Sequence, residues 1–173
     1  MALIDILQTE DVKAVLCEFA GGYRAGMTAD QLLRYAPYHA SLGARAGNSV
    51  GKKLGIRSLA RRSFELPQGL TLSGVSLLCA LFAQGITVEA VEESPTRDAL
   101  LLRGTVPSSI FHYGGEISVN VTGSWARSTA EITIIYPGQI FVWGSGGRLI
   151  AKLRHHCDRA LARLQSCPSL RIL

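Results

Sequence analysis

Acidic residues are absent from one long part of this sequence. Between Asp30 and Glu65 there is no aspartate or glutamate, in a chain whose net charge is +5. The basic residues of the same stretch are Arg34, Arg45, Lys52, Lys53, Arg57, Arg61 and Arg62. A one-sided charge distribution of this kind is typical of a surface that binds an anionic partner, and also of a solvated basic face.

Aromatic residues are absent from the same region, between Ser41 and Ser63. Nucleic-acid bases would therefore find no side chain there on which to stack, and binding would depend on charge. The candidate residues for contact with an anion or with nucleic acid are Arg45, Lys52, Lys53, Arg57, Arg61 and Arg62. A second basic block lies near the C-terminus, at Arg148, Lys152, Arg154, Arg159 and Arg163. Nucleic-acid binding is the alternative functional hypothesis.

Paired cysteines and long apolar runs are also missing. The four cysteines, Cys17, Cys79, Cys157 and Cys167, are widely spaced, which argues against a zinc knuckle and against a secreted disulfide framework. No segment approaches the roughly 20 apolar residues of a membrane span, and the N-terminus lacks the features of an export signal. We therefore expect a cytoplasmic protein with reduced thiols, no transmembrane segment, no metal and no cofactor.

Charged residues are scarce overall, at 18% of the chain against roughly 25% in soluble domains, while hydrophobic residues reach 47%. This apolar excess has to be covered. A hydrophobic small molecule in a cavity, a second copy of the chain in a homo-oligomer, or the other subunits of a larger complex would each cover it. Composition does not separate these three.

Strict alternation of apolar and polar residues predicts a sheet in the second half of the chain. Ile117, Val119 and Val121 alternate with polar residues over 116–122, and the pattern repeats over 130–136 after a short polar connection. Further strands are predicted over 63–66, 86–92, 99–105 and 139–143. The sequence therefore predicts an antiparallel sheet of five to six strands with one covered face.

Helical spacing of apolar residues predicts four helices around this sheet. They are expected over 3–20, over a short stretch that starts near Thr28 and ends at Pro37, over 72–84, and over 148–164. The predicted class is α+β, with the sheet packed against the long C-terminal helix. The predicted division is a helical N-terminal extension with a connector rich in Gly, Lys and Arg over 1–60, and an α+β domain over 61–173.

Four glycines, Gly43, Gly47, Gly51 and Gly55, recur at every fourth position of the connector. In a helix they would form a smooth stripe for a neighbouring backbone, although each costs roughly 1 kcal/mol relative to alanine. A Gly-striped helix and a flexible basic linker both stay open. The segment 46–53 approximates a phosphate-binding loop, but Ala46 and Lys53 stand where that loop needs glycine and Ser/Thr, so we reject that reading.

The order of elements from 61 to 165, with the run Tyr136-Pro137-Gly138-Gln139-Ile140-Phe141-Val142-Trp143-Gly144 before the last helix, resembles small START-like (helix-grip-like) bacterial domains. The resemblance implies a curved antiparallel sheet that grips the C-terminal helix over an apolar cavity. The side chains expected to line that cavity are Leu78, Phe82, Ile132, Ile134, Phe141, Trp143, Leu153 and Cys157. The leading hypothesis is a non-enzymatic module that binds a hydrophobic ligand or another protein.

Three other clusters are weaker candidates. His112 and Glu116 lie beside glycines and would suit acid–base chemistry, but a surface loop explains them better. His155, His156 and Cys157 are adjacent on a helix, so their side chains diverge by about 100° and we expect a packed thiol rather than a metal site. For Trp125 and Trp143 a place in the core or at an interface is favoured over a pocket wall.

Overall fold

The fold was analysed in a computed structural model that describes residues 3–21, 55, 57–108, 114–139 and 144–170. One five-stranded antiparallel sheet has the order β1-β5-β4-β3-β2, so β1 and β2 are its edges. The strands are β1 (Arg57–Leu66), β2 (Thr87–Glu93), β3 (Ala99–Val106), β4 (Gly115–Gly123) and β5 (Ser128–Pro137). The helices are α1 (Leu3–Leu7), α2 (Glu10–Ala20), α5 (Leu70–Ala83) and α6 (Ser145–Leu164), followed by a short 3-10 helix at Pro168–Leu170. The predicted α+β class is confirmed.

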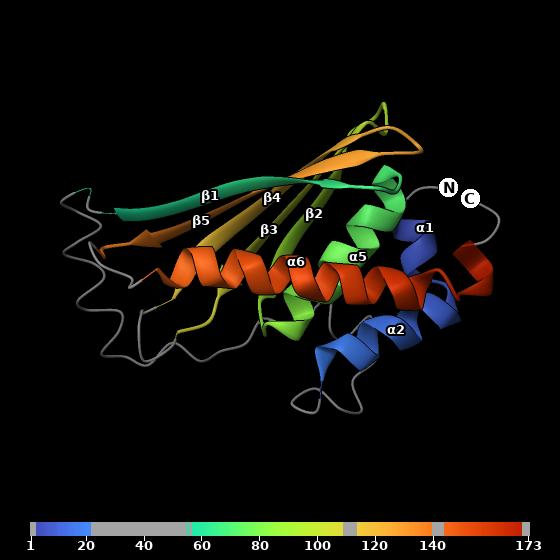
Figure 1. The fold of residues 1–173 in the computed structure, drawn as a ribbon, viewed down its shortest axis with the longest axis horizontal. Helices are drawn as coiled ribbons and strands as arrows, with labels where there is room; N and C mark the ends of the chain where they lie inside the picture. Colours follow the sequence, from blue (N-terminus) through green and yellow to red (C-terminus); the bar gives the residue numbers. More distant parts are fainter. Residues whose placement is uncertain (1–2, 22–54, 56, 109–113, 140–143, 171–173) are drawn as a thin grey trace.

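All the helices lie on one face of the sheet (Figure 1). The strand side chains on that face are buried: Ile117, Val119 and Val121 of β4 face the helices, while Glu116 and Asn120 are exposed on the other side. This alternation is what the sequence predicts for a sheet with one covered face. The outer face is open in the part of the chain that the structure describes.

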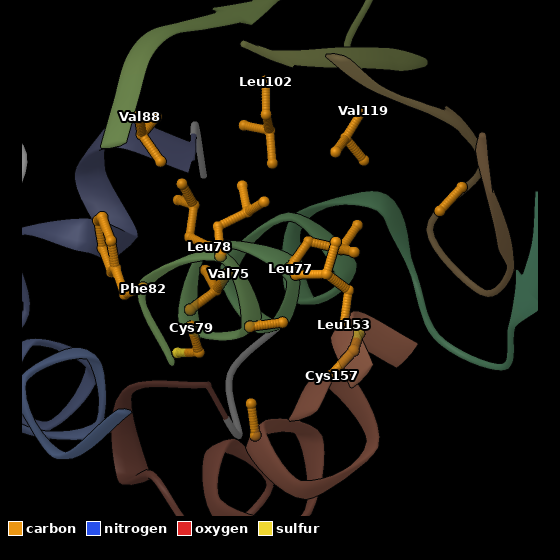
Figure 2. Close-up of a cluster of buried hydrophobic side chains, with 14 of the residues drawn as sticks. Val75, Leu77, Leu78, Cys79, Phe82, Val88, Leu102, Val119, Leu153 and Cys157 are labelled. Atoms are coloured by element: carbon orange, nitrogen blue, oxygen red, sulfur yellow. The ribbon is translucent and has the colours of Figure 1, made fainter. Parts of the chain in front are cut away.

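Helix α5 is the centre of the molecule. It contacts β2, β3 and β4 on one side and α1, α2 and α6 on the other. Figure 2 shows its side chains between Leu102 and Val119 of the sheet and Leu153 and Cys157 of α6. The longest apolar run of the sequence, over 75–83, predicts a buried helix, and α5 is buried on all sides from Ser73 to Phe82. A helix enclosed in this way accounts for much of the apolar excess.

The first predicted helix, over 3–20, is wrong in one respect, because it is two helices. The hydroxyl of Thr9 donates a hydrogen bond to the Ile6 carbonyl at 2.8 Å, and the extended backbone of Thr9 becomes the N-cap of α2. A threonine hydroxyl bonded in this way competes with continuous helical hydrogen bonding. Both helices contribute to the same hydrophobic core as the sheet, through residues such as Leu3, Leu7 and Leu16.

Two elements begin three or more residues earlier than predicted. Strand β1 starts at Arg57 rather than at Ser63, because it pairs with β5 along its whole length, from Arg57 opposite Pro137 to Leu66 opposite Ser128. The predicted boundary between residues 60 and 61 therefore falls inside a strand. Helix α6 starts at Ser145 rather than at Arg148, and Gly146 lets it lie so close to β1 that a Cβ there would come within 2.4 Å of the Ala60 Cβ.

Several predicted segments lie outside the described residues. They are the short helix that ends at Pro37, the glycine-striped connector up to Leu54, and residues 140–143 of the predicted last strand. Gln139, the first residue of that strand, is buried but does not belong to a strand. Its side-chain amide donates a hydrogen bond to the Gly114 carbonyl at 3.1 Å.

Candidate interaction surface

The first edge of the sheet, β1, is basic and has an exposed apolar side chain. Arg57, Arg61 and Arg62 are exposed, and Leu59 between them is 59% exposed. Arg61 forms an ion pair with Glu131 on the neighbouring strand β5, with 2.6 Å between Nη2 and Oε2. Such exposed pairs contribute little to stability, so the arginines of β1 mainly set the charge of this edge.

The opposite edge, β2, is acidic. Its three glutamates are Glu89, Glu92 and Glu93, within a strand of seven residues. Each has a partner inside the chain: Glu89 accepts a hydrogen bond from the Thr105 hydroxyl, Glu92 lies 3.8 Å from Arg103, and Glu93 accepts from the Leu3 N–H at 3.1 Å. None of the three had been singled out from the sequence, although their density in one short strand was a visible signal.

A mostly apolar groove of about 380 Å³ lies along β2. Leu3 and Leu7 of α1 form one wall, and residues 88–91 with Glu93 of β2 form the other. Val91 faces this groove and is 38% exposed. The groove exists because α1, which is only five residues long, covers part of the inner face of the edge strand.

The second hollow, of about 550 Å³, lies at the end of β1 beside the turn between β4 and β5. Its lining is Glu65, Leu66, Pro67, Thr122, Gly123, Arg127, Ser128 and Thr129. In the adjacent turn Trp125 is 91% exposed, so its predicted place in the core is wrong, whereas a place at an interface remains a prediction. The indole is left outside because the backbone of this turn packs on the start of α5, where the Leu70 N–H donates to the Ser124 carbonyl at 3.0 Å.

The predicted cavity residues lie in the packed core, as far as the structure describes them. Leu78, Phe82, Ile132, Ile134, Leu153 and Cys157 are each at most 2% exposed and belong to one hydrophobic cluster, while Phe141 and Trp143 lie outside the described residues. Neither of the two hollows described above is lined by any of these six. Leu78 and Phe82 belong to α5, and Figure 2 shows Leu153 and Cys157 of α6 on the side of α5 away from Leu102 and Val119 of the sheet.

A row of polar atoms crosses the interior beside α5. The Ser73 and Ser128 hydroxyls are 2.6 Å apart, and Ser128 donates to the Gln68 carbonyl at 3.1 Å. The Ser76 hydroxyl lies 3.1 Å from the sulfur of Cys157. Burial raises the pKa of the Cys157 thiol to about 11, and it raises the pKa of Cys79 as well. Both thiols are therefore protonated at neutral pH and unsuited to nucleophilic attack.

The residues predicted to contact anions are only partly described. Arg57, Arg61 and Arg62 lie on β1, whereas Arg45, Lys52 and Lys53 lie outside the described residues. On α6, Arg163 pairs with Glu18 of α2 at 2.8 Å, and Arg154 lies over the Phe64 ring of β1. The basic residues of α6 thus take part in packing this helix against its neighbours.

The acid–base and metal candidates are not assembled into a site by the described part of the chain. His112 lies outside it, and Glu116 is an exposed residue at the start of β4. The rings of His155 and His156 are 5.7 Å apart and inclined by 62°, and Cys157 is fully buried, as predicted for a packed thiol. No group of three or more His, Cys, Asp or Glu that could hold a metal ion occurs among the described residues.

No helix within the described ranges is long and apolar enough to cross a membrane. Comparison of this chain with protein-family models, with curated proteins and with solved structures found no match. The geometry of the edges and grooves is therefore the basis on which a function can be argued.

Proposed function

We propose that this chain is a non-enzymatic protein-interaction module, a subunit of an oligomer or of a larger assembly, and that it binds its partner through the edges of its sheet. One observation supports this most directly. Of the three large apolar side chains that are exposed among the described residues, two lie on the edge strands, Leu59 on β1 and Val91 on β2. An edge strand with unpaired backbone groups and an exposed apolar side chain is a template for another chain.

The hydrophobic-ligand alternative has less support. The six described side chains that would line the cavity are buried in one hydrophobic cluster, and buried apolar groups packed in this way already have their contacts. Nucleic-acid binding also has less support from the described residues, because Arg61 is paired with Glu131 inside the chain.

Removal of the apolar side chains at the edges tests the proposal. The tagged chain and the double variant L59S/V91S would be purified from the source organism under native conditions, and their masses measured by native mass spectrometry. The wild-type chain should be found in an assembly heavier than the 18.6 kDa monomer, and the double variant should be found largely as the monomer. Exposed Val and Leu side chains cost little when replaced in the folded monomer, so the variant should remain folded.

The matched control is Trp125→Ser, which removes the third exposed apolar side chain, from the turn between β4 and β5 and from neither edge strand. It should leave the assembly intact. A bare monomer for the wild-type chain would contradict the proposal. An assembly that survives L59S/V91S but not W125S would also contradict it, because the interface would then lie at the turn.

A further inference from the structure

The two edges of the sheet have opposite charges. The exposed basic residues of β1 are Arg57, Arg61 and Arg62, and the acidic residues of β2 are Glu89, Glu92 and Glu93. Like charges on facing strands destabilise a pair and opposite charges stabilise it. Two copies that meet β1 to β1 or β2 to β2 would repel, whereas β1 of one copy and β2 of another attract.

The charges match on both faces of the sheet. Residues opposite each other in a ladder share a face, so Arg62, opposite the buried Ile132, lies on the inner face with Glu93, which is opposite Leu100. Arg61, opposite Thr133, lies on the outer face with Glu92, which is opposite Leu101. A pairing of β1 with β2 therefore brings a basic residue and an acidic residue together above and below the new ladder.

Strand directions allow this pairing to repeat. All neighbours in the order β1-β5-β4-β3-β2 are antiparallel, so the first and fifth strands, β1 and β2, run in the same direction. A second copy placed beside the first in the same orientation would add its β1 parallel to β2. Such a head-to-tail contact leaves one free edge of each kind, and further copies extend it into a ring or a filament.

The shape of the β2 edge limits where the ladder forms. A bulge between Val88 and Ala90 interrupts its regular register, so the straight part is Ala90–Glu93. The groove of about 380 Å³ beside Val91 lies on the inner face of the same segment. The exposed side chain on the inner face of an incoming β1 is Arg62, which would meet Glu93 at the wall of this groove.

Charged edge residues commonly serve to prevent aggregation. That explanation fits a sheet whose two edges carry charge of the same sign, because every contact between the edges of two copies would then be repulsive. Opposite signs block only the contacts between identical edges and favour the contact between different ones. On the basis of the proposed interaction function, we infer that the partner is a second copy of this chain. The two copies bind head to tail, with the basic β1 of one copy beside the acidic β2 of the other.

Charge reversal of each edge tests this inference on the purified recombinant full chain, by sedimentation velocity over a range of concentrations. R57E/R62E makes both edges acidic, and E89K/E92K makes both edges basic. Arg61, which is paired with Glu131, and Glu93, which binds the start of α1 through the Leu3 N–H, are left in place. The wild-type chain should self-associate, and each variant alone should do so about tenfold more weakly or not at all.

A one-to-one mixture of the two variants should associate again, because the acidic β1 of one meets the basic β2 of the other. K152E/R159E on α6 changes the net charge by the same amount as R57E/R62E and should associate as the wild type does. If a reversed variant does not unfold cooperatively, the neutral pair R57Q/R62Q replaces it, with the same expectation of weakened association.

The inference is overturned if the wild-type chain is monomeric at every concentration, if either reversed variant associates as strongly as the wild type, or if the mixture stays monomeric. These outcomes differ from a failure of the proposed function. A recombinant chain that is monomeric alone but is found in an assembly in its source organism would bind a different protein through its edges, and only the identity of the partner would be wrong.

Discussion

At the scale of single residues, the adjacent histidines of α6 have different surroundings. His155 is exposed, whereas His156 is half-buried, and its Nδ1 has no hydrogen-bond partner among the described residues. Burial lowers the pKa of His156, and the nearby charges of Arg159, His155 and Lys152 lower it further. The sequence predicted that these side chains diverge, because successive helical residues do, but it did not indicate which of them is buried.

This difference predicts how stability depends on pH. The pKa of His156 is depressed below its ordinary value of 6.5, so the unfolded chain binds the proton more readily than the folded one. The contribution of the neutral imidazole is fully present above about pH 6.5 and is lost as the pH falls through the lower folded value. The free energy of unfolding should therefore decrease between about pH 7.5 and about pH 5.5.

Chemical denaturation at several pH values measures this effect. His156→Gln should flatten the decrease, and the matched variant His155→Gln should leave it in place. If the free energy of unfolding falls equally steeply with decreasing pH in the wild type and in His156→Gln, then folding does not lower the pKa of His156, and the prediction is wrong.

At the scale of the elements, the start of α5 is fixed by the turn between β4 and β5, which lies beside the end of β1. A Cβ built at Gly69, the N-cap of α5, would lie 2.0 Å from the Trp125 carbonyl oxygen in the turn between β4 and β5. The neighbour is backbone, so it cannot move aside by a rotamer change. A local sequence pattern does not show this contact, because it joins residues far apart in the chain.

We expect Gly69→Ala to lower the free energy of unfolding by about 1 to 3 kcal/mol, the usual cost of forcing extra volume into a packed site. Gly147 of α6 provides the matched control, because a Cβ there meets nothing within 4 Å. Gly147→Ala should raise stability by about 0.5 to 1 kcal/mol through its better helix propensity. Urea denaturation of the two variants decides this, and a Gly69→Ala variant as stable as the wild type would contradict the close approach.

Edge strands are the elements that sequence patterns identify least well. The central strands β4 and β5 alternate strictly because one face of each is buried, and they were predicted nearly to the residue. Over the first seven residues of β1 no side chain is fully buried, so Arg57–Arg62 gave no alternation to recognise. Backbone pairing with β5 forms that part of the strand, and pairing partners are not visible in a local pattern.

At the scale of the whole molecule, the sequence predicted the class, the sheet and the last helix, and it predicted that the apolar excess would need a cover. The long apolar run of α5 indicated a buried helix, but it did not indicate that the sheet would lie on one side of that helix and three other helices on the other. The candidate surface depends on which strands are outermost. That order, with basic β1 and acidic β2 at the edges, follows from long-range pairing alone.

If the edges of the sheet bind the partner, amide hydrogen exchange will differ between the assembled protein and the dissociated monomer. Exchange would be measured, segment by segment, in both states. We expect β1 and β2 to exchange much more slowly in the assembly than in the monomer, while the central strand β4 is equally protected in both. Edge strands that exchange at the same rate in assembly and monomer would contradict this expectation.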